Sequence, residues 1–169
     1  MAEMSTPPDD AAGRPRHFDS LQQEAFLNLW RTYDRLHLVE EELFSRYELT
    51  PQQYNALRLL RGEGGRKLAT LVLASRLVSR APDITRLLDK LEERGLVVRE
   101  RPADNRRMVL IGLTPAGGAL LADLDEQVRA CHARQLGHLS ESQLRAIVAL
   151  MHAARAPHED PASHWSPSV

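Results

Sequence analysis

The chain has 169 residues, with a single cysteine, few aromatic side chains and no long apolar run. One cysteine excludes a disulfide within the chain, and nothing indicates an oxidising compartment. The first 16 residues lack the apolar stretch that a signal peptide needs. No segment approaches the roughly 20 apolar residues of a membrane-spanning helix. We therefore expect a cytoplasmic protein that does not associate with membranes.

Signatures of catalysis are also missing. We find no glycine-rich βαβ unit and no set of nucleophile, base and orienting group. We accordingly expect no catalytic residue, no cofactor and no metal. The seven histidines are scattered, although His132, His138 and His152 would offer a zinc or copper site if the last two helices, or two subunits, brought them together. Cys131 lies in an apolar pattern, where a buried thiol has a raised pKa and is unreactive; the alternative is a redox sensor.

Charge is present but unevenly distributed. The net charge is −1, so the whole chain is no generic binder of polyanions. From Arg61 to Arg107, however, 12 basic residues face 7 acidic ones, a net charge of +5, and the remainder of the chain carries −6. This distribution indicates a localised anion-binding surface, unless the surface charges cluster by chance.

The stretch from Ala81 to Thr114 overlaps this basic middle, residues 61–107, and has a clear pattern of secondary structure. Ile84, Leu87, Leu88 and Leu91 recur at helical spacing, which predicts an amphipathic helix over Pro82–Arg94 that Gly95 terminates. Two β-rich runs then follow, LVVRER and RMVLIGL, joined by the turn-forming RPADNR. We also predict a helix over Lys67–Leu77. Two short helices joined by a tight turn, the second basic and followed by a ribbon, indicate a helix-turn-helix with a two-stranded wing.

Long helices are predicted on both sides of this segment. Helical spacing of apolar residues predicts one helix from Phe18 to Arg46, and Thr50-Pro51 starts a second that ends before Gly62. Thr114-Pro115 and the capping box at Ser140 start two more. Positions 121, 124, 128, 131 and 135 alternate by three and four, a seam that suits helix packing between subunits.

The order of these elements and several local strings resemble the MarR family of winged helix-turn-helix transcriptional regulators. The strings are ITRLLDKLEERGLVVRE at 84–100, PADNRR at 102–107 and LTPAG at 113–117. The most specific element is Asp104-x-Arg106 at the wing tip, and the similarity extends from about Leu21 to Ala154. The resemblance implies a homodimer that binds a near-palindromic operator on double-stranded DNA, as a repressor that a small aromatic or phenolic effector releases.

We therefore expect a mainly α (α+β) fold. Residues 50–114 form the winged helix-turn-helix head, and residues 17–48 and 115–156 form a helical dimerisation lobe. Residues 1–16 are expected to be a disordered leader and residues 157–169 a flexible tail.

The DNA-binding surface is assigned to the start of the second short helix and to the wing tip: Arg80, Ala81, Pro82, Asp83, Thr85, Arg86, Arg101, Asp104, Asn105, Arg106 and Arg107. By resemblance, Arg106 enters the minor groove, and Arg107 or Arg101 binds phosphate. Arg86 is suited to guanine. We expect Asp104 to orient Arg106 or an arginine of the recognition helix.

Several roles stay open. Thr85 suits a phosphate or a thymine methyl, and Arg80 a phosphate or a base. Family members often open the recognition helix with small polar residues, whereas this chain has Ser79-Arg80-Ala81-Pro82-Asp83, so either Arg80 or Ala81 faces a base. Asp83 either accepts from cytosine N4 or favours the helix dipole.

Trp30, Tyr33 and His37 lie about one turn apart on the first long helix and either line an effector pocket or belong to an ordinary core. Two other function classes remain. One is the winged-helix dimerisation lobe of an enzyme such as a methyltransferase, and the other is a protein-binding winged helix with no role on DNA.

Overall fold

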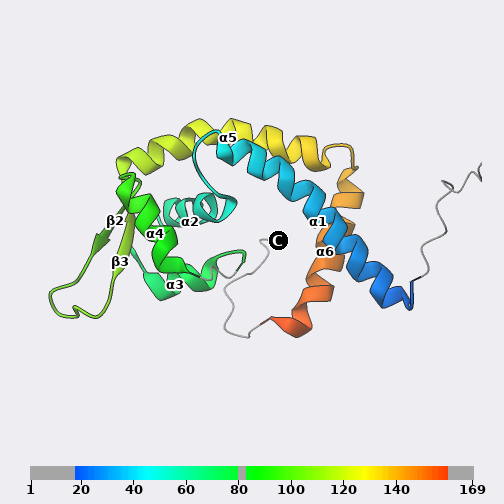
Figure 1. Cartoon of the computed structure of the whole chain (residues 1–169), viewed down its shortest axis with the longest axis horizontal. Helices are drawn as coiled ribbons and strands as arrows, with labels where there is room; N and C mark the ends of the chain where they lie inside the picture. Colours follow the sequence, from blue (N-terminus) through cyan, green and yellow to red (C-terminus); the bar gives the residue numbers. More distant parts are fainter. Residues whose placement is uncertain (1–17, 80–82, 160–169) are drawn as a thin grey trace, which may run out of the picture. The chain divides into compact units, whose positions relative to one another are not determined.

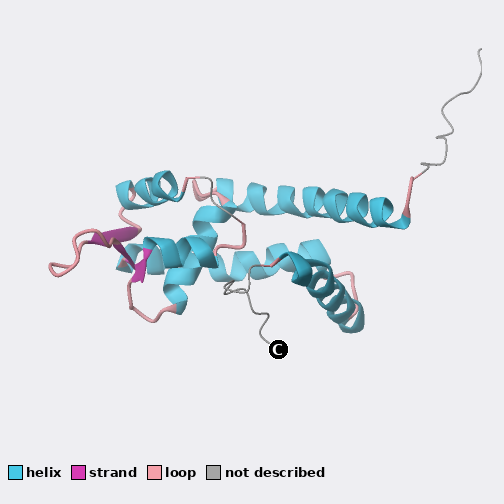
Figure 2. Ribbon diagram, turned by 90° about the horizontal axis from the view of Figure 1, so that it is seen from below, coloured by secondary structure: helices cyan, strands magenta, loops and turns pink. Residues whose placement is uncertain are grey.

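Six α-helices and a small sheet make up the part of the chain that the computed structural model describes, residues 18–79 and 83–159 (Figures 1 and 2). In chain order the elements are α1 (Leu21–Ser45), α2 (Pro51–Gly62), β1 (Leu68–Ala69), α3 (Thr70–Arg76), α4 (Ile84–Glu93), β2 (Val97–Glu100), β3 (Leu110–Leu113), α5 (Pro115–Leu136), α6 (Glu141–Arg155) and the 3-10 turn η1 (Ala156–His158). Contacts divide the chain into two compact units, residues 1–35 and residues 36–169. None of the described helices is long and apolar enough to span a membrane.

The helix starts follow from local capping chemistry, as predicted. The Thr50 and Ser140 hydroxyls accept hydrogen bonds from the backbone N–H groups of Gln53 and Gln143, whose side chains complete both capping boxes. Thr114 caps α5 in the same way through the N–H of Gly117. Each bond joins residues only three positions apart, so these helix starts can be read from short strings.

The sheet has three strands, and our prediction of a two-stranded wing was incomplete. β1 pairs antiparallel with β3, which pairs antiparallel with β2. The helix predicted over 67–77 therefore begins only at Thr70, because Leu68 and Ala69 pair with Ile111 and Leu110. The N–H and hydroxyl of Thr70 both donate to the carbonyl of Val109, at 3.0 and 3.2 Å. This pairing partner lies about 40 residues along the chain, beyond what local periodicity detects.

The core of the second unit joins the helix-turn-helix to the two long helices. Its fully buried side chains are Leu57, Leu60, Leu73, Leu88, Leu91, Ile111, Leu121 and Leu124. The apolar face predicted for α4 therefore points inward, and Gly95 ends that helix at φ +67, as predicted.

The heptad-like seam of α5 packs within the chain, and our expectation that it joins subunits was wrong. Leu121, Leu124 and Cys131 belong to the core of the second unit. The buried side chain of Gln135 donates to the carbonyl of Leu36 at 2.8 Å. The seam faces the last part of α1, which local spacing alone could not distinguish from a helix of a second subunit.

Candidate nucleic-acid interface

The recognition helix α4 begins with a side-chain cap. The Asp83 carboxylate accepts a hydrogen bond from the backbone N–H of Arg86 at 2.9 Å. An aspartate at this position satisfies an otherwise unpaired N–H group and suits the positive end of the helix dipole. Of the two roles considered for Asp83, the structure therefore shows the helix-capping role. Arg80, Ala81 and Pro82 lie outside the described residues.

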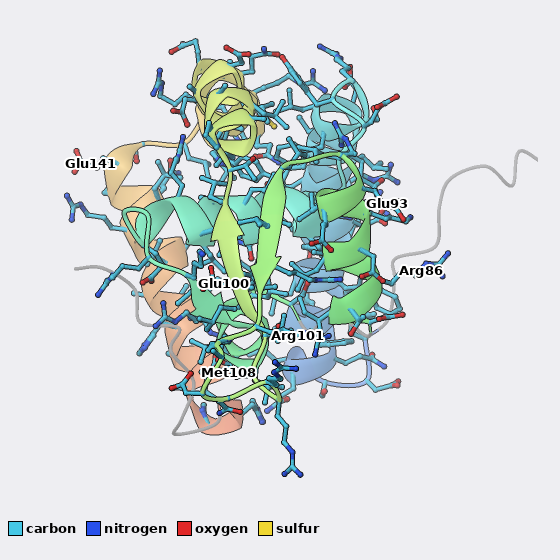
Figure 3. The ribbon with its side chains drawn as sticks, turned by 90° about the vertical axis from the view of Figure 1, so that its left-hand side faces the viewer. Arg86, Glu93, Glu100, Arg101, Met108 and Glu141 are labelled. Atoms are coloured by element: carbon cyan, nitrogen blue, oxygen red, sulfur yellow. The ribbon has the colours of Figure 1, made fainter. Side chains whose placement is uncertain are left out.

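Polar side chains of α4 stand at the surface. Thr85, Arg86 and Lys90 are all exposed. Figure 3 shows Arg86 extending away from the helix, whereas Arg101 lies by the wing. An exposed arginine on the polar face of a recognition helix is available for a bidentate contact with guanine O6 and N7.

The wing loop folds into two consecutive turns centred on Asn105. Its N–H donates to the carbonyl of Pro102 at 3.2 Å, and its carbonyl accepts from the N–H of Met108 at 3.1 Å. These turns present Arg106 and Arg107 as exposed side chains. Asn105, which we had grouped with the DNA-binding residues, thus shapes the loop through its backbone.

Asp104 orients none of the described arginines, and Arg80 at the start of the recognition helix lies outside the described residues. Its carboxylate makes no hydrogen bond or ion pair with any residue in 18–79 or 83–159. The neighbouring guanidinium of Arg101 instead donates to the backbone carbonyl of Arg106, at 3.5 Å. Asp104 lies in the first of the two turns, between Pro102 and Asn105, where its side chain is exposed.

The cations of the basic middle divide into two groups. One group is paired inside the chain: Arg61 with Asp125, Arg66 and Arg76 with Glu63, Lys67 with Glu100, Arg99 with Asp89 and Glu92, and Arg94 with the carbonyls of Tyr47 and Glu48. The other group makes no side-chain hydrogen bond or ion pair with the described residues: Arg86 and Lys90 on α4, and Arg106 and Arg107 in the wing loop. The free positive charge is therefore concentrated on the recognition helix and the wing.

These two elements border a common groove of about 380 Å³. Thr85 and Leu88 contribute from α4, and Arg101, Arg107 and Met108 contribute from the wing. Of the predicted residues, Thr85 of the helix and Arg101 and Arg107 of the wing thus meet at one groove, which Arg99 of β2 also lines. Arg86 and Arg106 do not line this groove.

Arg99 is the residue that sequence reasoning missed. It lies in β2, and its guanidinium contacts the carboxylates of Asp89 and Glu92 on α4, at 2.5 and 3.2 Å. It also donates to the carbonyl of Thr85 at 3.2 Å. The only sequence signal was the i, i+4, i+7 spacing of positions 85, 89 and 92, which places them on one face of a helix.

The residues predicted to line an effector pocket have mixed surroundings. Trp30 is 62% exposed, and it lines an open hollow of about 440 Å³ with Phe18, Leu27, Asn28, Arg31 and Asp34. Tyr33 is equally exposed but does not line that hollow. His37 lies half-buried beside Glu41, with 3.2 Å between the imidazole Nε2 and the carboxylate.

The sulfur and histidine side chains offer no evident sensor within the described chain. Burial raises the pKa of the Cys131 thiol, whose sulfur approaches the carbonyl of Val39 at 3.8 Å. This confirms the prediction of a buried, weakly acidic thiol. Within the described part of the chain, His132, His138 and His152 belong to no group of three or more side chains that could hold a metal ion. A cluster between two subunits stays a prediction.

Comparison with known proteins places this geometry in a family. The model of the MarR family matches residues 49–109. A crystal structure of a MarR transcription factor from Planctomyces limnophilus is 57% identical and covers 81% of this chain and 99% of its own, with a TM-score of 0.65. A mutant MarR from E. coli in complex with operator DNA, 21% identical, shares the fold over 80% of this chain and 99% of its own, with a TM-score of 0.70.

A curated relative agrees with these matches. The HTH-type transcriptional regulator FarR of Neisseria gonorrhoeae is 34% identical over 86 residues, which is 51% of this chain and 58% of that regulator. The mainly helical fold with its small sheet matches the winged-helix structures of these proteins. The chain therefore belongs to the MarR family of DNA-binding transcriptional regulators.

Proposed function

We propose that this protein is a homodimeric repressor in the cytoplasm that binds a near-palindromic operator and is released by a small aromatic effector. The observation that carries the DNA-binding part is the sorting of cations. Five cations of the basic middle pair with carboxylates, namely Arg61, Arg66, Lys67, Arg76 and Arg99. The side chains of Arg86, Lys90, Arg106 and Arg107, on α4 and in the wing loop, make no hydrogen bond or ion pair with the described residues. Unpaired cations that flank a recognition helix supply the phosphate contacts of a DNA-binding surface.

Within this proposal the roles are divided between the helix and the wing. Arg86 reads a base in the major groove, and Thr85 contacts a phosphate or a thymine methyl beside it. Arg106 enters the minor groove, and Arg107 and Arg101 bind phosphate. Arg80 and Ala81 would complete the contact at the start of α4.

DNA binding is tested with a duplex that the wild-type protein selects from a random library, and with a scrambled duplex of equal length. Arg106→Ala should weaken binding to both duplexes and lower the slope of log affinity against log salt by about one. Arg86→Ala should cost ~1–3 kcal/mol on the selected duplex and less on the scrambled one.

Arg129→Ala is the matched control for this test. It removes an exposed arginine that pairs with Glu126 on α5, away from the proposed surface. It should leave both affinities and the salt slope unchanged. If Arg106→Ala and Arg86→Ala behave as this control does, the proposed DNA-binding surface is wrong.

The homodimer is supported by apolar side chains that the described chain leaves uncovered. On α1 these are Leu21, Phe26, Trp30 and Tyr33, and on α6 they are Ile147, Val148 and Leu150. α6 has no buried residue although it is amphipathic. Helices of this kind are stabilised by packing rather than by propensity, so we assign 17–48 and 115–156 to a dimerisation lobe and 50–114 to the head.

Light scattering should give twice the chain mass of 19.0 kDa. The mass of a single chain at all concentrations would contradict the dimer.

The effector is supported by the hollow beside Trp30, which combines apolar side chains with the polar Asn28 and Arg31. Pockets for small molecules are concave and largely apolar, with a few polar groups that fix orientation. In a Trp165→Phe variant, whose remaining tryptophan is Trp30, titration with a series of phenolic acids should quench the tryptophan fluorescence and release the selected duplex at the same concentrations. Quenching without release of DNA would show that the ligand binds beside Trp30 but does not control DNA binding.

A further inference from the structure

We propose that Arg99 is a positioning residue that sets the orientation of the recognition helix relative to the wing. The proposal rests on the DNA-binding function proposed above and adds a residue that does not itself contact DNA. Arg99 belongs to the wing strand β2, where it pairs with Ile111 of β3. Its side chain extends from the sheet to α4, where it borders the groove between helix and wing, and 25% of it is exposed.

The contacts of Arg99 cover two turns of the recognition helix. One guanidinium nitrogen meets Asp89 at 2.5 Å and Glu92 at 3.2 Å, and the other donates to the carbonyl of Thr85 at 3.2 Å. Seven residues separate Thr85 from Glu92, which is about 10 Å along a helix axis. Because a guanidinium is planar and holds several hydrogen bonds in fixed directions, these contacts resist both rotation and sliding of α4.

The first of these contacts acts where the proposed DNA contacts are made. The carbonyl of Thr85 belongs to the first turn of α4, and the side chains of Thr85 and Arg86 project from the same turn. A displacement of about 1 Å is enough to break a bidentate contact with a base. Arg99 therefore influences the base-reading side chains through the backbone that carries them.

The charge around Arg99 differs in sign from that expected around the arginines proposed to bind phosphate. One positive charge faces two carboxylates, so the local sum of Arg99, Asp89 and Glu92 is negative. A phosphate approaching this cluster would be repelled rather than attracted. Arg99 should consequently release no counterion when DNA binds.

Asp89→Asn is the decisive variant, because loss of its charge and loss of its contact with Arg99 should change DNA affinity in opposite directions. Removal of a negative charge from the recognition helix should tighten binding to any duplex if electrostatics alone acts. If Asp89 instead holds Arg99 against α4, the same change should weaken binding to the selected duplex by about ten-fold, the loss expected from one base contact. The scrambled duplex should be bound as tightly as by the wild type, or more tightly.

Arg99→Ala should show the same loss of discrimination with an unchanged salt slope. Arg99→Lys should restore only part of it, because an ammonium lacks the planar fork. Arg76→Ala is the matched control, since Arg76 also pairs internally with a carboxylate, that of Glu63, and is similarly exposed. Circular dichroism melts establish that each variant is folded at the assay temperature. Asp89→Asn keeps the number of non-hydrogen atoms in the side chain, so it carries the test if Arg99→Ala fails to fold.

Three outcomes would overturn the proposal. In the first, Arg99→Ala equals the control on both duplexes. In the second, Arg99→Ala lowers the salt slope by about one, as loss of a phosphate contact does. In the third, Asp89→Asn binds the selected duplex more tightly than the wild type. Failure of the wild type to discriminate between any two duplexes would instead overturn the proposed function, and the role of Arg99 with it.

Discussion

Leu91 in α4 is completely buried, whereas Leu150 in α6 exposes 64% of its surface. Both belong to amphipathic helices, of 10 and 15 residues respectively. The difference lies in what surrounds them: the apolar stripe of α4 packs against α2 and the sheet, and α6 has no buried side chain among the described residues. One helix completes its core within the chain, and the other leaves its apolar side chains exposed.

This contrast separates two sources of stability. The core from Leu43 to Cys131 does not depend on protein concentration, because all its members belong to one chain. The apolar residues of α6 and of the first part of α1 gain protection only when something covers them, and stability from that source rises with concentration. If the outer helices pair as proposed, the core of the head stays stable whether or not they are paired.

The largest expected effect on stability comes from truncating a leucine to alanine in α4, compared with the same truncation in α6. Leu91→Ala should lower the free energy of unfolding by about 2–5 kcal/mol, because it leaves a cavity in a packed core. Leu150→Ala should change it by no more than about 0.5 kcal/mol at concentrations where the protein is monomeric. Urea denaturation measures both. Equal losses would mean that α6 is covered within the chain.

An intermediate effect is expected on assembly. Val148→Glu places a charge on the exposed apolar face of α6, and burial of an unpaired carboxylate in an interface is unfavourable. The dimer should weaken by at least ~2 kcal/mol, the range of a hot-spot residue, while the isolated chain keeps its fold. Sedimentation equilibrium measures the association, with Glu141→Gln as a control at an exposed polar position of the same helix.

Two glycines should respond in opposite directions. Gly95 ends α4 at φ +67, where a side chain is strained, so Gly95→Ala should destabilise the head by about 1 kcal/mol. Gly118 lies inside α5, and a methyl group there would meet no atom within 4 Å. Gly118→Ala should therefore stabilise the protein by roughly 0.5–1 kcal/mol. Thermal unfolding of the two variants measures the difference, and a shared sign would contradict the described backbone.

Local chemistry explains why much of the fold was predictable. The caps at Thr50, Thr114 and Ser140 join residues three positions apart, and the stripe of α4 repeats within a dozen residues. Short strings contain all the information that such features need.

Pairing between distant segments explains what was missed. β1 exists because Leu68 meets Ile111, and the seam of α5 faces α1 of the same chain, through Gln135 and Leu36. The charge count in the basic middle also misled, because it treated Arg99 and Arg61 as free cations. Only the structure shows which arginines have internal partners.

The smallest effect is expected at the ion pair that joins the head to α5. Arg61 donates two hydrogen bonds to Asp125, at 2.8 and 2.9 Å, and these bonds hold the pKa of the Asp125 carboxyl below its ordinary value. Both side chains are more than a third exposed, so solvent screens the pair and its contribution is small.

A depressed pKa stabilises the fold at pH values above that of the unfolded carboxyl, about 3.9, and this contribution is lost as the pH falls through the lower, folded value. Asp125→Asn should therefore melt slightly below the wild type at pH 7, and the two melting temperatures should converge in acid. Asp123→Asn, at an exposed carboxylate on the same helix that makes no ion pair with a described residue, is the control. A difference for Asp125→Asn that persists unchanged in acid would show that packing, rather than charge, joins α2 to α5.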